Sequence, residues 1–330
     1  MIRFGTIGTG FITDAFIKGA LKTGEMELVA IHSRSAEKGK AMAERYGENI
    51  VCFTDLQEMA QSDLLDAVYI ASPNSLHGPQ ATLFLTHGKH VLVEKAAASN
   101  AQELEEVMTL ALDKGLVFME AMKSLTMPAY LILKDNLHRI GKVRKYIGIY
   151  CQYSSRYDRH KNGEYVNTFH KEYSNGSLLD IGIYGLYPLL DLFGKPLEVK
   201  AQGTLLTDGG VDGSGSVLLK YEDMEGMVIH SKISDSHLPS EIQGEKGSIL
   251  IDRIGSPTRL TLILRDGSRE VIEPQTHKED MYYEAMEFVK TIRSKKTFSD
   301  INHASLALSV HRVMDEARRQ MGLVYPSDRT

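Results

Sequence analysis

Cysteine is scarce in this chain, with only Cys52 and Cys151 among 330 residues. Two thiols are too few for a disulfide framework or for a cysteine-rich zinc site. The histidines, such as His160, His230 and His237, also lack the spacing of a metal motif such as H-E-x-x-H. We therefore expect a protein of a reducing compartment that needs no catalytic metal.

Excess positive charge and long apolar runs are also missing. The formal net charge is -5, which argues against a nucleic-acid partner and leaves a small molecule as the expected partner. No apolar run approaches the roughly 20 residues that span a bilayer. The first predicted strand begins within two residues of Met1, which leaves no room for a secretory signal. We expect a cytoplasmic protein without membrane insertion or export.

Short apolar runs alternate with amphipathic stretches over the first 120 residues, which is typical of strand-helix units and a parallel, doubly wound sheet. At this length and with 42% hydrophobic residues, two domains are expected. Residues 1–121 are predicted to form a Rossmann domain. Its expected strands are Ile2–Ile7, Leu28–His32, Val51–Phe53, Ala67–Ala71, His90–Val93 and Val117–Met119.

The pattern changes after Met122, where residues 122–330 are predicted to form an α+β domain around a large, mostly antiparallel open sheet. Pro128 opens a helix, and apolar residues then recur with a period of two, as in a half-buried strand. The expected strands are Val143–Tyr153, Leu197–Leu205, Val217–Tyr221, Val228–Ile233, Ile249–Ile251, Leu260–Leu264 and Arg269–Ile272. The further expected helices are Leu178–Phe193, Met281–Arg293 and Ala304–Met321.

The expected second sheet lacks a second row of helices to cover its outer face. An uncovered apolar face of this kind marks an interaction surface. We therefore expect a homodimer, or a dimer of dimers, through the C-terminal sheet.

A glycine loop follows the first strand and opens a helix, which is the context of a dinucleotide fingerprint. Gly8 permits a tight turn, and Gly10 lets the backbone approach a pyrophosphate at the helix N-terminus. Thr13 stands where a third glycine is usual. The alternative is a glycine turn without a ligand, which the five further strand-helix units disfavour. The predicted cofactor contacts here are Gly8, Thr9, Gly10, Phe11 and Ile12.

The second strand ends without the acidic residue that would bind the ribose 2′-hydroxyl of NAD. Ser33, Arg34 and Lys38 could instead hold a 2′-phosphate. NADP is therefore expected in preference to NAD, although NAD stays possible. The alternative is that Arg34 and Lys38 form a solvated surface.

Polar residues also follow the fourth and fifth strands, at the sheet edge where ligands bind. Ser72, Pro73, Asn74 and His77 follow the fourth, and Glu94 and Lys95 follow the fifth. A lysine at the end of an apolar strand costs desolvation unless it meets a partner or serves a reaction. A purely structural Glu94–Lys95 pair fits this position equally well.

Asp180 and Tyr184 interrupt an apolar helical stretch four residues apart, hence on one face. A buried aspartate should be hydrogen-bonded, and a tyrosine beside it can give or take a proton. The alternative is a helix cap and a packed ring. Tyr157 and His170, on the preceding connection, could reach a substrate or lie on the surface.

These motifs occur in one order along the chain: G-x-G, Pro-Asn-x-x-His, Glu-Lys and Asp-x-Gly-x-Tyr. The whole chain resembles the glucose-fructose oxidoreductase, inositol dehydrogenase and rhizopine-catabolism (Gfo/Idh/MocA) family. It departs from the family where Ala96 replaces a proline and where Asn175-Gly176 replaces a glycine pair. With a tyrosine at position 184, the chain resembles the branch of the family that contains glucose-fructose oxidoreductase, D-xylose dehydrogenase and the dimeric dihydrodiol dehydrogenases.

The resemblance implies an NAD(P)-dependent oxidoreductase that acts on a secondary alcohol of a sugar, polyol or cyclic diol. Tyr184 would exchange the proton with the substrate hydroxyl while hydride moves to or from nicotinamide, and Lys95 would favour the ionised phenol. Asp180 would orient the hydroxyl or the lysine. Asn74 and His77 would line the nicotinamide and ribose side, with Glu94 at the ribose. Two alternatives are a nonenzymatic NADP-dependent regulatory protein and an enzyme for amino or imino compounds.

Overall fold

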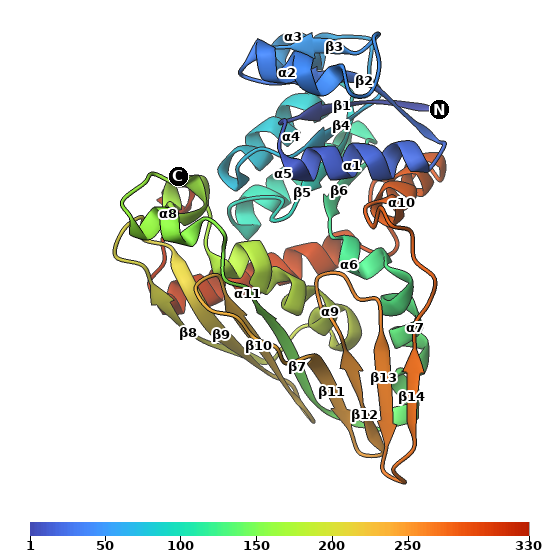
Figure 1. Ribbon diagram of the computed structural model, residues 1–330, viewed down its shortest axis with the longest axis vertical. Coiled ribbons are helices and arrows are strands. Elements are labelled where there is room, and N and C mark those ends of the chain that lie inside the picture. The colour runs from blue at the N-terminus through green and yellow to red at the C-terminus, as the bar shows by residue number, and fades with distance from the viewer. Residues whose placement is uncertain (330) are drawn as a thin grey trace. The chain divides into compact units, whose positions relative to one another are not determined.

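The computed structural model describes residues 1–329 of the chain. These residues fold into two compact units (Figure 1). The first unit comprises residues 1–122 and 277–304, and the second comprises residues 123–276 and the chain from residue 305. Within the described residues, no helix has both the length and the apolar character to cross a membrane. The compartment stays a prediction.

The first unit is a six-stranded, fully parallel sheet in the order β3-β2-β1-β4-β5-β6, which confirms the predicted Rossmann fold. Both ends of each of the six strands fall within two residues of the expectation. The strands are β1 (Ile2–Ile7), β2 (Met26–His32), β3 (Val51–Phe53), β4 (Ala67–Ile70), β5 (His90–Glu94) and β6 (Phe118–Ala121). The connecting helices are α1 (Phe11–Lys22), α2 (Ala36–Ala43), α3 (Leu56–Gln61), α4 (His77–Thr86) and α5 (Ala101–Lys114).

Helix α10 (Tyr282–Arg293) joins the first unit, which corrects the expectation that all of residues 122–330 form the second domain. Its residues Ala285, Phe288 and Val289 are buried in the same core as Phe16 of α1. Gly19 of α1 allows this contact, because a Cβ there would lie 2.7 Å from the backbone nitrogen of Tyr282. The amphipathic pattern of α10 predicted a helix, but it did not show which core the apolar face would join.

The second unit is an eight-stranded sheet in the order β14-β13-β12-β11-β7-β10-β9-β8. Only β7 and β10 pair in parallel, so the prediction of a mostly antiparallel sheet is confirmed. The strands are β7 (Val143–Cys151), β8 (Glu198–Leu205), β9 (Asp212–Lys220), β10 (Glu225–Ser231), β11 (Ser240–Gly244), β12 (Gly247–Ile251), β13 (Leu260–Leu264) and β14 (Arg269–Ile272). The sequence did not predict β11, whose only apolar residue is Ile242.

Helices of the second unit include α6 (Lys123–Thr126), α7 (Pro128–Asn136), α8 (Tyr157–Lys161), α9 (Ile183–Phe193) and α11 (Ala304–Met321). Helix α9 approaches the sheet closely, because Gly185 faces Val228 of β10 and Gly226 faces Leu189. On the sheet face toward α9, Tyr146 and Val228 are completely buried. The core of the unit therefore lies between α9 and this face.

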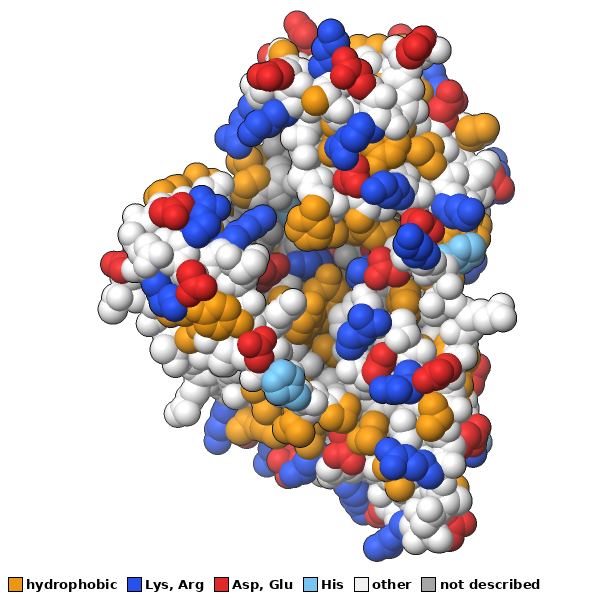
Figure 2. All heavy atoms as spheres, in the orientation of Figure 1, with side chains coloured by type: hydrophobic (Ala, Val, Ile, Leu, Met, Phe, Trp, Pro, Cys, Tyr) orange, Lys and Arg blue, Asp and Glu red, His pale blue; other side chains and the backbone are white. Residues whose placement is uncertain are grey.

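The opposite face of the sheet alternates with the core face and carries half-buried apolar side chains. Ile149 pairs with Ile229, and Ile147 pairs with Met227, across the β7–β10 ladder. Figure 2 shows hydrophobic side chains gathered along the sheet, with charges of both signs around them. We call Ile147, Ile149, Leu218, Met227 and Ile229 the outer patch.

Candidate active site

The glycine loop lies between β1 and α1. Gly8 has a φ of +108°, and a Cβ on it would lie 3.0 Å from the Ala71 carbonyl oxygen. Gly10 is the N-cap of α1, with no side-chain cap and open space around its Cβ position. The backbone amides of the first turn therefore face an uncrowded surface, which suits the approach of a pyrophosphate. Thr13, at the third glycine position, is completely buried without disturbing the helix.

The end of β2 forms a short polar loop in front of α2. The Ser35 hydroxyl caps α2 by accepting from the Lys38 amide at 3.3 Å. The Ser33 hydroxyl accepts from the Ser35 amide at 3.2 Å and keeps its own proton for donation. Arg34 and Lys38 are exposed. These four side chains could hold a 2′-phosphate.

His77 joins the loops that follow β4 and β5. Its Nδ1 lies 2.7 Å from the Ala96 carbonyl and its Nε2 lies 2.8 Å from the Ser72 carbonyl. Burial lowers the pKa of His77, while both carbonyls oppose this shift. The side chain therefore holds the two loops together, and its expected cofactor contact stays a prediction. Asn74 begins the 3₁₀ turn that precedes α4.

Lys95 is half-buried directly after β5, and the peptide bond between Lys95 and Ala96 is cis. Its loop is anchored by Glu120 of β6, whose Oε1 accepts from the Ala97 amide at 2.8 Å. Glu94 is buried and accepts a hydrogen bond from the Tyr69 hydroxyl. Glu94 therefore has a partner other than Lys95, and its ribose contact stays a prediction.

Asp180 and Tyr184 lie on a helical segment, as predicted, but its first five residues, Leu178–Gly182, form a π-helical turn before α9. Wide turns of this kind often occur at functional sites. Asp180 is 35% exposed, and Tyr184 is half-buried with its ring 5.6 Å from that of Tyr150. The segment presents a carboxylate and a phenol about one turn apart.

The start of this turn is anchored by a completely buried cluster that the sequence did not reveal. Asp212 of β9 accepts from the Ser177 hydroxyl and the Leu178 amide, both at 2.7 Å, while His230 Nδ1 lies 2.7 Å from the same hydroxyl. Because the hydroxyl proton goes to Asp212, His230 donates from Nδ1. Burial raises the pKa of Asp212 to about 6 and lowers that of His230 to about 3.

Lys232 is a second residue that sequence reasoning missed. Its Nζ donates to Asp180 Oδ2, and the side chain is only 6% exposed. A signal was present, because strand alternation places Val228, His230 and Lys232 on one face, where a lysine is out of place.

Tyr157 and His170 belong to an aromatic cluster next to Lys232. Phe169 lies at its centre, with ring distances of 5.5 Å to Tyr157 and 4.9 Å to His160. His170 stacks on Tyr165 at 4.0 Å. Neither Tyr157 nor His170 is fully exposed, so they form part of a packed wall rather than open surface.

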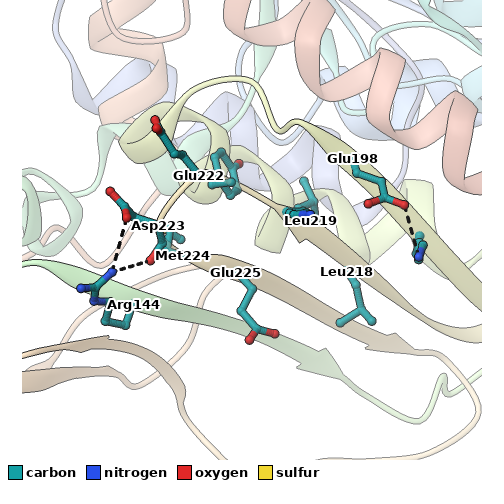
Figure 3. Close-up of a pocket in the computed structure, with 11 residues that line it drawn as sticks. Arg144, Glu198, Leu218, Leu219, Glu222, Asp223, Met224 and Glu225 are labelled. Atoms are coloured by element: carbon teal, nitrogen blue, oxygen red, sulfur yellow. Dashed lines mark hydrogen bonds and ion pairs between the residues drawn. The ribbon is translucent and has the colours of Figure 1, made fainter.

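A cavity of about 470 Å³ lies at the ends of β8, β9 and β10, away from these residues (Figure 3). Four of its charges form two pairs, Arg144 with Asp223 at 3.6 Å and Lys200 with Glu198 at 3.2 Å. Neither Asp180 nor Tyr184 lines it. The cavity therefore offers no predicted reacting group.

Comparison with known proteins covers both units. The family model described as "Oxidoreductase family, NAD-binding Rossmann fold" matches residues 2–122, and the GFO/IDH/MocA C-terminal domain matches residues 137–250. A scyllo-inositol 2-dehydrogenase (NADP(+)) of Bacillus subtilis (strain 168) is 50% identical over 328 residues, with 99% of each chain covered. A trans-1,2-dihydrobenzene-1,2-diol dehydrogenase of Mus musculus is 28% identical over 345 residues, again with 99% of each covered.

Solved structures show the same fold at lower identity. A 3-ketoreductase from Actinomadura kijaniata, in complex with NADP and TDP-benzene, matches with a TM-score of 0.84 and 23% identity, covering 97% of this chain and 98% of that one. A levoglucosan dehydrogenase in complex with NADH and levoglucosan matches with a TM-score of 0.83 and 21% identity over the same shares. The chain thus belongs to the Gfo/Idh/MocA family and is an NAD(P)-dependent oxidoreductase.

Proposed function

We propose that the protein catalyses the reversible, NADP(H)-dependent oxidation of a secondary alcohol on a cyclic polyol or a sugar. The observation that carries this proposal is the segment that begins with the π-turn, which presents Asp180 and Tyr184 about one turn apart. A carboxylate that accepts hydroxyl hydrogen bonds beside a phenol that exchanges a proton suits a polyhydroxylated substrate. The 50% identical relative, named for scyllo-inositol, supports a ring polyol as the first substrate to test.

Each polar group has a separate role in this reaction. Tyr184 takes the proton of the reacting hydroxyl during oxidation and returns it during reduction. Asp180 accepts a hydrogen bond from the substrate and fixes its orientation. Lys95 supplies positive charge that favours the ionised phenol. The bound nicotinamide supplies the hydride acceptor or donor.

The first unit suits a dissociable NADP. The backbone at Gly10 leaves room for the pyrophosphate, and the start of α1 offers helix amides as its donors. Ser33 and Arg34 hold the 2′-phosphate, with Lys38 adding charge one turn into α2. The donor set at the end of β2, with a hydroxyl and two cations, matches a phosphate better than a ribose hydroxyl.

We also propose that two copies associate through the outer patch. Its members are apolar, with Leu218 exposed and the other four half-buried, and a second copy of the same face would cover them symmetrically. Charged residues such as Lys145 and Glu225 lie around the patch and pair with each other at 3.6 Å. An apolar centre with a polar rim is the arrangement of a protein interface.

The test of the reaction is a steady-state assay at the nicotinamide absorbance. The panel is scyllo-inositol, myo-inositol, D-xylose, D-glucose and trans-cyclohexane-1,2-diol, each with NADP and NAD. Lys95→Met and Tyr184→Phe should each lower kcat by 100-fold or more while NADPH binding, followed by fluorescence, stays within about threefold. Lys114→Met, an exposed lysine of the same unit, is the control. Wild-type protein inactive on the whole panel, or unchanged kcat in both variants, would reject the proposal.

A further inference from the structure

Lys232 is held in place by backbone hydrogen bonds on both sides. Its amide donates to the Gly213 carbonyl at 2.8 Å, and its carbonyl accepts from the Ser154 amide at 2.9 Å. These bonds extend the pairing of β10 beyond Ser231, toward the start of β9 and the chain after β7. The Cα of Lys232 is thus fixed by the sheet, and its side chain points to the same face as that of His230.

The ammonium of Lys232 lies where water can hardly reach it. The side chain is 6% exposed, and Nζ lies 5.5 Å from the centre of the Phe169 ring. A buried ammonium loses hydration, which its surroundings must replace. Asp180 provides a charged hydrogen bond, the face of Phe169 provides a cation–π contact, and the buried Asp212 carboxyl lies within electrostatic reach.

Asp180 is fixed from two directions. The first residues of its turn are bound by Asp212 through the Ser177 hydroxyl and the Leu178 amide. Gly176, just before them, leaves no room for a side chain, because its Cβ would lie 2.0 Å from Asp212 Oδ1. The carboxylate itself is then bound by Lys232. A carboxylate has about four acceptor positions, of which the ammonium occupies one.

We propose that Lys232 is a positioning residue for substrate recognition: it holds the Asp180 carboxylate in the orientation that accepts a hydrogen bond from a polyol hydroxyl. This inference rests on the proposed function, because it assigns to Asp180 the contact with the substrate. A neutral residue at position 232 would remove the ammonium that binds Asp180 Oδ2 and helps to fix the orientation of this carboxylate. The loss should therefore appear in substrate binding before it appears in turnover.

The test compares KM and kcat for scyllo-inositol, or for another panel compound that the wild type oxidises. Lys232→Met, which keeps most of the apolar stem, should raise KM by at least tenfold and change kcat by less than threefold. Lys232→Arg, which keeps the charge, should restore KM to within fivefold of the wild type. NADPH affinity, measured by fluorescence titration, should change by less than twofold in both variants.

Two further variants separate positioning from simple destabilisation. Lys134→Met breaks another lysine–aspartate pair of the same unit, with Asp191 at 2.9 Å, and should leave KM unchanged. Asp180→Asn with Lys232→Met should be no more than threefold worse than Asp180→Asn alone, because Lys232 acts through Asp180. If Lys232→Met does not bind NADPH, Lys232→Gln replaces it, with KM raised at least fivefold.

The outcomes distinguish this inference from the proposed function. Wild type active on a polyol, with KM in Lys232→Met or Lys232→Gln within twofold of the wild type, overturns the role of Lys232 and leaves the reaction standing. A double variant that loses the full product of the two single effects also overturns it. A wild type without activity on any polyol overturns the proposed function and this inference together.

Discussion

Asp212 Oδ2 and His230 Nδ1 lie 3.7 Å apart inside the second unit, and both side chains are completely buried. This burial moves the pKa values of the two groups in opposite directions. The pKa of Asp212 rises from 3.8 to about 6, and that of His230 falls from 6.5 to about 3. Over the pH range between these values, both groups are held in their uncharged forms. Asp212 Oδ1 and His230 Nε2 have no hydrogen-bond partner among the described residues.

This pair makes two opposite contributions to the pH dependence of stability. Between about pH 4 and 6 the folded state keeps a proton on Asp212 that the unfolded chain releases, so this contribution falls as pH rises. In the same window the unfolded chain binds a proton at His230 that the folded state does not, so this contribution rises with pH. In the wild type these two changes of the free energy of unfolding with pH cancel each other.

Replacing either Asp212 or His230 should leave the pH dependence that the other residue contributes to the free energy of unfolding. Relative to the wild type, Asp212→Asn should gain stability as pH rises from 4.5 to 6, by up to about 1.4 kcal/mol per pH unit. His230→Asn should lose stability over the same range. Urea unfolding at several pH values measures both differences, and profiles parallel to that of the wild type would contradict the pKa shifts.

Gly176→Ala should destabilise the second unit strongly. The φ of Gly176 is +141°, and the new Cβ would lie 2.0 Å from Asp212 Oδ1. Asp212 cannot move away without losing its bonds to Ser177 and Leu178. We expect a loss of about 3 kcal/mol in the free energy of unfolding.

Gly163→Ala is the matched control for this substitution. Gly163 has a φ of +81° but nothing within 4 Å of its Cβ position, so only backbone strain remains. That strain should cost about 1 kcal/mol. Equal losses in the two variants, measured by urea unfolding, would show that the space near Asp212 has no influence.

Arg34→Gln should weaken the preference for NADP. A charge-assisted hydrogen bond to the 2′-phosphate is worth about 1.5 to 3 kcal/mol, so KM for NADPH should rise about tenfold or more. KM for NADH, which lacks that phosphate, should stay within twofold. Lys40→Gln removes another exposed cation of α2 and should affect neither value. A parallel rise for both cofactors would place Arg34 elsewhere than at the 2′-phosphate.

Ile229→Asp should dissociate the proposed dimer. Ile229 lies in the outer patch, where a charge would be tolerated by a single copy but not between two copies. Light scattering after gel filtration should give twice 36.8 kDa for the wild type and 36.8 kDa for the variant. Leu112→Asp, at an exposed leucine of α5, should keep the wild-type mass. A wild type that is monomeric at micromolar concentration would end the dimer proposal.

Strands were predicted best where their pattern depends on their own residues. Strands β4 and β5 of the first sheet are nearly continuous apolar runs, so their limits could be read directly. β9 was predicted five residues too short at its start, because Asp212–Ser216 contains no apolar side chain. These residues are in the strand because they pair with β8 and β10. The local amino-acid composition does not indicate this pairing.

The sequence alone determined the order of most strands, the glycine loop and the placing of Asp180 and Tyr184 on one helical segment, because each depends on residues close together in the chain. Only the tertiary structure decided that α10 completes the first core and that Lys232, 52 residues after Asp180, binds its carboxylate. Contacts of this kind depend on which strands become neighbours in the sheet. That choice is made by packing the whole chain, so no local pattern contains it.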